Sequence, residues 1–203
     1  MKRSITIITI FVLSCIGAAS AREGIGSSFG NLTTGRALDK RAGMAQLGVG
    51  IGIGNDHRNS FTGSLSYGLF EFTEARLRFG LADADKVRVV IGGDFKYQFM
   101  DAGPALGDPF DLSTGLFFEY IEDIFQVGGQ AIASRPYLVG RMQALEPYAR
   151  FNVRLEHFNS DSHIEFGLNA GVRWGITPNI SLFGEIQIDG NEALFIGLQD
   201  SIF

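Results

Sequence analysis

The stretch IEFGLNAGVRWGITPNISLFGEIQID, residues 164–189, alternates apolar side chains with polar or small ones. Apolar residues from Ile164 to Trp174 share one parity, and glutamate, glycine, asparagine and arginine occupy the other. A period of two predicts a β-strand rather than a helix. The Thr-Pro-Asn sequence at 177–179 suits a tight turn, after which the alternation resumes from Ile180. The stretch is therefore predicted to be a β-hairpin with one apolar face and one polar, glycine-containing face.

The same alternation recurs through most of the chain and predicts an all-β, antiparallel fold. The composition agrees, because 27 glycines and 18 phenylalanines against five prolines suit many short strands. The sixth predicted strand loses its parity at Arg135-Pro136, which indicates a bulge or a loop. Ten strands are expected, or eight if the first or the sixth is misread, over residues 42–54, 60–70, 74–82, 86–100, 109–121, 124–142, 145–157, 164–175, 180–189 and 194–203.

The N-terminus has the form of a secretory signal over residues 1–21. Lys2 and Arg3 precede an apolar run at 5–16, and Ala-Ser-Ala at 19–21 suits cleavage. Cys15 lies within this signal, so the mature chain is expected to carry no thiol or disulfide; the alternative is a lipoprotein box with Cys15 lipidated. Residues 22–41 have no sustained period and are expected to form an exported leader or a short periplasmic N-terminal arm, followed by one barrel domain over 42–203.

Alternation alone leaves open which face is inside. Glycines cluster on the polar face, for example at Gly48, Gly92 and Gly167, whereas the apolar face carries Phe, Leu, Ile, Val and Tyr. A small closed barrel has room inside for few large side chains, so the glycine face is predicted to line the lumen and the bulky face to meet lipid. Aromatic residues near predicted strand ends suit interfacial girdles: Tyr67, Phe70, Phe72, Tyr97, Phe99, Tyr120 and Trp174. The alternative is a secreted sandwich with an apolar core.

The signal, the period-two hairpins with short turns and the terminal Phe203 together resemble the small Gram-negative outer-membrane β-barrel proteins of the OmpA/OmpX-like, porin-type kind. The resemblance covers residues 42–203 and concerns architecture. It implies a transmembrane, up-and-down barrel in the outer membrane, surrounded by outer-membrane lipid and inserted by the barrel-assembly machinery through the C-terminal strand ending in Phe203. The chain departs from the family in one respect, because Phe203 shares its parity with Ser201 and Gln199 rather than with Leu198.

The predicted lumen face carries seven cations and six anions. Charges in a narrow, poorly hydrated space should pair, because an unpaired buried charge is costly. A charge network that closes the lumen is therefore favoured over a conducting pore, and a strongly selective channel would be expected to show one sign of charge in excess. Its predicted members are Arg76, Arg78, Arg88, Asp94, Lys96, Asp111, Glu119, Arg150, Arg154, Glu156, Glu165, Arg173 and Glu185.

Catalysis is the less favoured alternative. The string EHFNSDSH at 156–163 places His157 near Ser160 and Ser162, and a histidine base with a serine nucleophile would suit an esterase like the outer-membrane lipid A deacylases. The string lacks their His-x-Ser order, and Glu156 has the opposite parity to His157. The loops are too short for an omptin-like protease. No metal-ligand spacing, cofactor motif or nucleic-acid footprint is present.

The sequence thus predicts an integral outer-membrane barrel with a structural or interaction role and a lumen closed by charges. A lipid-modifying esterase and a narrow channel remain the alternatives. After removal of the signal, the formal net charge changes from −5 to −7, because Lys2 and Arg3 leave with it.

Overall fold

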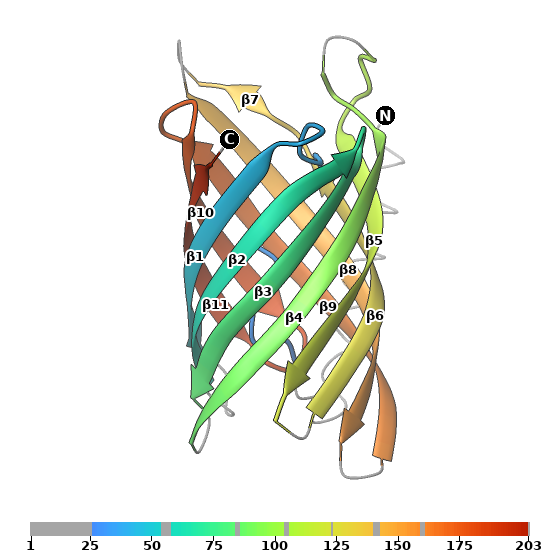
Figure 1. Ribbon diagram of the computed structural model, residues 1–203, viewed down its shortest axis with the longest axis vertical. Coiled ribbons are helices and arrows are strands. Elements are labelled where there is room, and N and C mark those ends of the chain that lie inside the picture. Colours follow the sequence, from blue (N-terminus) through green and yellow to red (C-terminus); the bar gives the residue numbers. More distant parts are fainter. Residues whose placement is uncertain are drawn as a thin grey trace, which may run out of the picture.

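The computed structural model describes residues 26–53, 58–83, 86–103, 106–122, 124–139, 143–158 and 161–202. They form a closed antiparallel β-barrel of ten strands, as predicted (Figure 1). The wall strands are β1 (Gly43–Gly52), β2 (Asn59–Phe70), β3 (Thr73–Asp83), β4 (Val87–Met100), β5 (Asp111–Ile121), β6 (Ile124–Ser134), β8 (Ala144–Phe158), β9 (Asp161–Gly175), β10 (Ile180–Ile188) and β11 (Ala193–Ser201). A two-residue strand, β7 (Tyr137–Leu138), pairs with the start of β8.

The barrel is an up-and-down meander in which each wall strand pairs with its neighbours along the chain. The sheet closes where β1 pairs with β11, with Met44 opposite Ser201, while β6 pairs with β8 across the short β7 excursion. The predicted break at Arg135-Pro136 is confirmed, because β6 ends at Ser134. Within the described ranges, no helix is long and apolar enough to cross a membrane.

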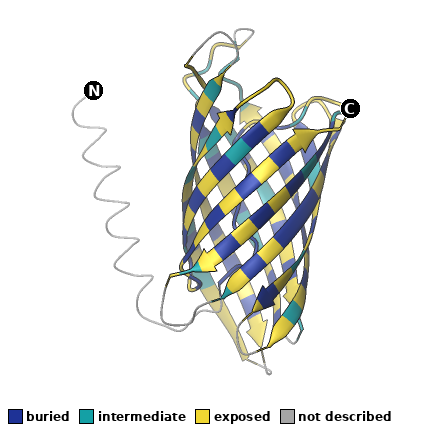
Figure 2. Cartoon of the chain, turned by 90° about the vertical axis from the view of Figure 1, so that its left-hand side faces the viewer, coloured by how far each residue is buried: buried dark blue, intermediate teal, exposed yellow. Residues whose placement is uncertain are grey.

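Burial alternates along the strands, so each strand shows a row of exposed and a row of buried residues (Figure 2). The exposed row is apolar: Leu77 is 66% exposed and Leu116 is 68% exposed. The buried row is largely polar and includes Arg76 and Arg150 at 3% and 1%. The prediction that the bulky face points outward and the glycine face inward is confirmed, and the alternative with an apolar interior is wrong.

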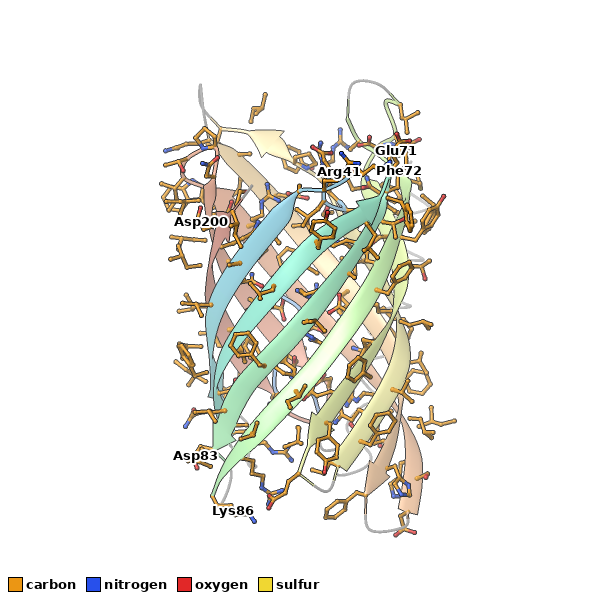
Figure 3. All side chains as sticks on the ribbon, in the orientation of Figure 1. Arg41, Glu71, Phe72, Asp83, Lys86 and Asp200 are labelled. Atoms are coloured by element: carbon orange, nitrogen blue, oxygen red, sulfur yellow. The ribbon has the colours of Figure 1, made fainter. Side chains whose placement is uncertain are left out.

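The barrel has two rims, which we call the C-terminal rim and the opposite rim. The C-terminal rim carries the β2–β3 turn with Glu71 and Phe72, together with Asp200 near the end of β11, and the opposite rim carries Asp83 and Lys86 (Figure 3). Exposed aromatic side chains occur near both rims. Tyr67, Phe70, Phe72, Tyr97, Phe99 and Trp174 lie toward the C-terminal rim, and Tyr120 lies toward the opposite one.

Residues 26–38, which we call the lumenal segment, correct the prediction of an arm outside the barrel. Gly26 to Gly35 are all buried, and their hydrogen-bond partners are inward side chains of strands on several sides of the barrel. The segment therefore runs inside the lumen, and parts of its blue trace are visible behind the front strands β2 and β3 (Figure 1). The predicted signal, residues 1–21, lies outside the described residues.

Candidate functional site in the lumen

Glu185 on β10 holds the middle of the lumenal segment through the backbone. Its carboxylate accepts hydrogen bonds from the backbone N–H groups of Asn31 at 2.6 Å and Leu32 at 2.7 Å. Gly30 and Leu32 have φ angles of 63° and 45°, and such left-handed residues let successive N–H groups converge on one anion. Tyr148 and Asn169 donate to the same carboxylate at 2.6 and 2.8 Å. The carboxylate thus accepts four hydrogen bonds, and Glu185 is only 1% exposed.

Glu119 on β5 holds the segment nearer the opposite rim. It accepts hydrogen bonds from the Ser27 hydroxyl at 2.7 Å and from the Ser28 backbone N–H at 2.8 Å. Gln126 and Gln187 donate to the carbonyl oxygens of Gly26 and Ser27 at 3.0 and 2.7 Å. Because each of these bonds satisfies a buried polar group, the contacts replace water that the segment would otherwise need.

Cations of the barrel wall bind carbonyl oxygens of the same segment. Arg76 and Arg78 donate to the carbonyls of Asn31 and Gly30 at 2.7 and 3.2 Å. Lys96 donates to the carbonyls of Thr34 and Arg36 at 3.1 and 2.8 Å and to the Thr33 hydroxyl. The segment is therefore bound through both kinds of backbone group, and hydrogen bonds to charged partners are roughly twice as strong as neutral ones.

Two apolar side chains anchor the segment. Phe29 is buried in a cluster with Ala82, Val90, Ile121 and Ile124, and the guanidinium of Arg78 lies 4.7 Å from its ring centre. Leu32 belongs to a second cluster with Tyr148, Phe183, Ala193 and Phe195. Both clusters lie inside the barrel, where their members are 4% exposed or less. The lumen thus contains two small apolar cores, and each includes one residue of the lumenal segment.

The glycines of the inner face leave the space that the segment fills. A methyl group added at Gly48 would meet the Leu32 side chain at 2.8 Å, and one added at Gly92 would meet the Phe29 ring at 3.0 Å. A void around Phe29, Asn31 and Leu32 measures about 10 Å³, roughly the space that holds one water. A larger cavity of about 340 Å³ lies at the C-terminal rim, beside Thr33, Arg36 and Arg173.

The predicted charge network divides into ion pairs and groups with neutral partners. Asp94 pairs with Arg76 at 2.9 Å and with Arg78 at 3.4 Å. Arg154 pairs with Glu156 at 2.7 Å. Arg150 donates to Gln130 and Asn169 and lies 4.7 Å from the centre of the Phe117 ring, while Asp111 accepts from Gln98 and from the Ala102 backbone. Glu165 is less buried and faces Arg154 in the β8–β9 register.

Four acids absent from the prediction pair with its cations. Glu74 pairs with Lys96 at 3.1 Å, Asp189 with Arg154 at 3.3 Å, Glu146 with Arg173 at 3.4 Å and Glu122 with Arg88 at 3.3 Å. Asp189 also accepts, through its carbonyl, a hydrogen bond from Arg154. Glu74, Glu146 and Asp189 lie within the predicted strands 74–82, 145–157 and 180–189 and share the parity of Arg76, Arg150 and Glu185, so the alternation itself places them on the polar face. Glu122 lies in the β5–β6 turn, where parity gives no signal.

Two of the three catalytic candidates, His157 and Ser162, lie at the opposite rim. The His157 Nδ1 atom and the Ser162 hydroxyl are 2.9 Å apart on the β8–β9 hairpin, and both residues are exposed. Ser160 lies outside the described residues. Glu156 turns into the lumen, where Arg154, Gln126 and the Gly26 backbone bind it. The acid nearest in sequence therefore does not orient the histidine. Among the described residues, no three His, Cys, Asp or Glu side chains gather as a metal site would need.

No family model matches this chain, and no curated protein matches it. Solved structures do match. A designed transmembrane β-barrel is 16% identical, with 81% of this chain and 98% of that chain covered and a TM-score of 0.41. The COG4313 outer membrane channel of Pseudomonas putida F1 is 10% identical, with 85% and 99% covered and a TM-score of 0.46. The N-terminal β-barrel domain of OprF from Pseudomonas aeruginosa is 13% identical, with 80% and 96% covered and a TM-score of 0.35.

These similar structures are a designed transmembrane β-barrel, an outer membrane channel and an N-terminal β-barrel domain. At such identities and TM-scores the likeness carries no argument about function. The barrel architecture rests on the strand pairing described above.

Proposed function

We propose that the protein is an integral outer-membrane β-barrel with a structural or interaction role, whose lumen is closed by the lumenal segment together with the charge network. The observation that carries the proposal is the grip of Glu185 on the Asn31 and Leu32 backbone in the middle of the lumen. A barrel built to conduct would need that space for water and ions.

The outward face supports the location in a membrane. Its middle carries Leu77, Ile91 and Leu116, each more than half exposed. An apolar belt around the whole barrel would be costly to expose to water, and soluble proteins rarely expose apolar patches of that size. Lipid removes the cost, because an outward apolar band is what a bilayer solvates. Export by the signal at residues 1–21 and passage to a Gram-negative outer membrane belong to the same proposal.

The C-terminal strand supports a role in assembly. Leu194, Ile196 and Leu198 form an outward apolar row on β11, which is the row that the assembly machinery would meet. Phe203, whose parity differs from theirs, lies outside the described residues. We propose that the machinery recognises this strand despite the displaced terminal aromatic.

Two experiments test the proposal. Outer-membrane material run on SDS gels with and without boiling should show a heat-dependent mobility shift, because a closed barrel resists SDS when cold. Release into the soluble periplasm without a shift would overturn the membrane location.

In planar bilayers the intact protein should give no resolved conductance steps, whereas a variant lacking residues 26–38 that keeps its heat shift should give steps. Regular steps from the intact protein would overturn the closure and support the narrow channel.

A second candidate function is ester hydrolysis on outer-membrane lipid, favoured by the 2.9 Å contact between His157 and Ser162. In that mechanism His157 is the base and Ser162 the nucleophile, and the deacylated lipid loses one acyl chain. Mass spectrometry of lipid from cells with the wild type and with His157→Ala decides. An acyl loss that depends on His157 in a variant with an intact heat shift supports the enzyme, and identical lipid profiles with and without the protein refute it.

A further inference from the structure

The lumenal segment has a fixed direction, which its first residue shows. The Gly26 backbone N–H donates to Glu156 at 3.2 Å, and its carbonyl accepts from Gln126 at 3.0 Å. Gln126 lies just after the β5–β6 turn and Glu156 just before the β8–β9 turn, and both turns belong to the opposite rim. A Cβ atom added to Gly26 would also touch Asn191 in the β10–β11 turn. Gly26 therefore lies at the opposite rim.

The other end of the segment lies at the C-terminal rim. The Leu38 backbone N–H donates to Glu74 at 3.0 Å, and the Arg41 backbone N–H donates to the Gly68 carbonyl at 2.8 Å. Glu74 and Gly68 flank the β2–β3 turn. The chain then reverses and begins β1 at Gly43, which runs back toward the opposite rim.

The order of the two apolar anchors agrees with this direction. Phe29 packs against Ile121 and Ile124, which flank a turn of the opposite rim, and Leu32 packs against Phe183 and Phe195 further into the barrel. An extended chain as long as residues 26–38 reaches at most about 45 Å, enough to cross a hydrocarbon core of about 30 Å. The segment is thus an additional crossing that runs through the lumen and is not one of the wall strands.

We infer that the chain preceding Gly26 and the chain following Ile202 emerge on opposite faces of the membrane. A wall with an even number of antiparallel strands places its two ends at one rim, and Met44 is indeed paired with Ser201. The lumenal crossing changes this result, because it returns the N-terminal end to the other rim. Gly26 then lies on the face opposite to the C-terminal end of β11. The inference rests on the proposed position of the barrel in a bilayer.

The test is cysteine labelling of cells with a membrane-impermeant maleimide. Three single-cysteine variants are compared: Glu23→Cys, Glu71→Cys and Lys86→Cys. Glu71 and Lys86 are exposed and mark the C-terminal and the opposite rim (Figure 3). The position 23 thiol is three residues from Gly26 and reaches at most about 11 Å from it, so it cannot return to the other rim. Because Cys15 leaves with the signal, each mature variant has one thiol, which the mass of the purified protein checks.

Intact cells and cells with a permeabilised outer membrane are labelled in parallel, and a heat shift on SDS gels verifies that each variant folds. We expect the position 23 and position 86 thiols to react in the same sample and the position 71 thiol to react in the other. If the position 23 thiol follows position 71 instead, while positions 71 and 86 remain on different faces, the inference is overturned and the membrane barrel stands. If positions 71 and 86 react on the same face, the membrane-spanning barrel fails, and the inference fails with it.

Discussion

The outer face and the lumen of the barrel are built by different kinds of interaction. The outer face is a repeating apolar belt in which Leu77, Ile91 and Leu116 each meet the same surroundings. The lumen is specific, because Glu185 and Lys96 each bind particular backbone atoms of the lumenal segment. An outer residue can therefore be exchanged for another apolar one at little cost, whereas an inner residue is fitted to a single partner. This difference predicts where substitutions will matter.

The largest effect is expected inside, for Leu32→Ala. The substitution empties part of the second apolar cluster, and a buried leucine truncated to alanine typically costs about 2–5 kcal/mol. The measurement is the free energy of unfolding in detergent, with the heat-shift midpoint as a second readout. Leu47→Ala is the matched control, because Leu47 is 52% exposed on the outer face and detergent fills the space that it leaves. Equal effects of the two substitutions would contradict the distinction.

A charge on the outer belt should have the next largest effect. Leu77→Arg places a guanidinium in the apolar band, beside the inward Arg78 that the lumen accommodates. A lipid-facing arginine near the bilayer midplane costs about 2–4 kcal/mol, and near the interface about 0–1 kcal/mol. Phe70→Arg at the C-terminal rim is the control and should be nearly neutral. Folding yield in lipid vesicles measures both, and a neutral Leu77→Arg would count against a lipid-facing belt.

A smaller effect is expected for Gly48→Ala, which tests how closely the segment fits the wall. The added methyl group would meet the Leu32 side chain at 2.8 Å and the Thr62 hydroxyl at 2.9 Å. Overpacking of this kind costs about 1–3 kcal/mol. In the double variant with Leu32→Ala, part of that cost should disappear, so the two changes should be non-additive. Gly184→Ala has no neighbour within 4 Å and serves as the control. Strict additivity would mean that Leu32 does not contact Gly48.

The smallest effect is expected at the opposite rim, where Lys86 and Glu122 form an exposed ion pair at 2.6 Å. The hydrogen bond from Lys86 lowers the pKa of the Glu122 carboxyl. A lowered folded-state pKa contributes stability above the unfolded pKa, and this contribution is lost as the pH falls through the folded pKa. Glu122→Gln should leave the unfolding midpoint at neutral pH almost unchanged, since solvent screens such pairs. A marked loss at neutral pH and high salt would show that the pair is coupled to the barrel.

The outer face was predictable because each strand carries its own signal. The alternation of Ile164, Phe166 and Leu168 with Glu165 and Gly167 is visible without any knowledge of the partner strands. The same parity also predicted which positions face the lumen. Glu74 and Asp189 lie on the polar parity at the ends of the predicted strands 74–82 and 180–189, so the same pattern places them in the lumen although the predicted network omits them.

The lumenal segment could not be predicted in this way. Its contacts are made mainly by backbone N–H and carbonyl groups, which every residue has, and its side chains follow no period. Its one indirect trace in the sequence is the glycine run at positions 48, 50 and 52, which predicts a strand with a very small inner face but not what lies against it. The partner of such a face depends on the closed barrel and not on any local pattern.

The central claim is that residues 26–38 occupy the lumen, and backbone hydrogen exchange of the intact protein in detergent tests it most directly. The amides of Ser28, Asn31 and Leu32, which donate to buried carboxylates, should exchange as slowly as those of the wall strands. Peptides covering residues 26–38 would then gain deuterium together with β1 and β11. Exchange of these peptides at the rate of an unfolded chain, while the wall strands remain protected, would contradict the account.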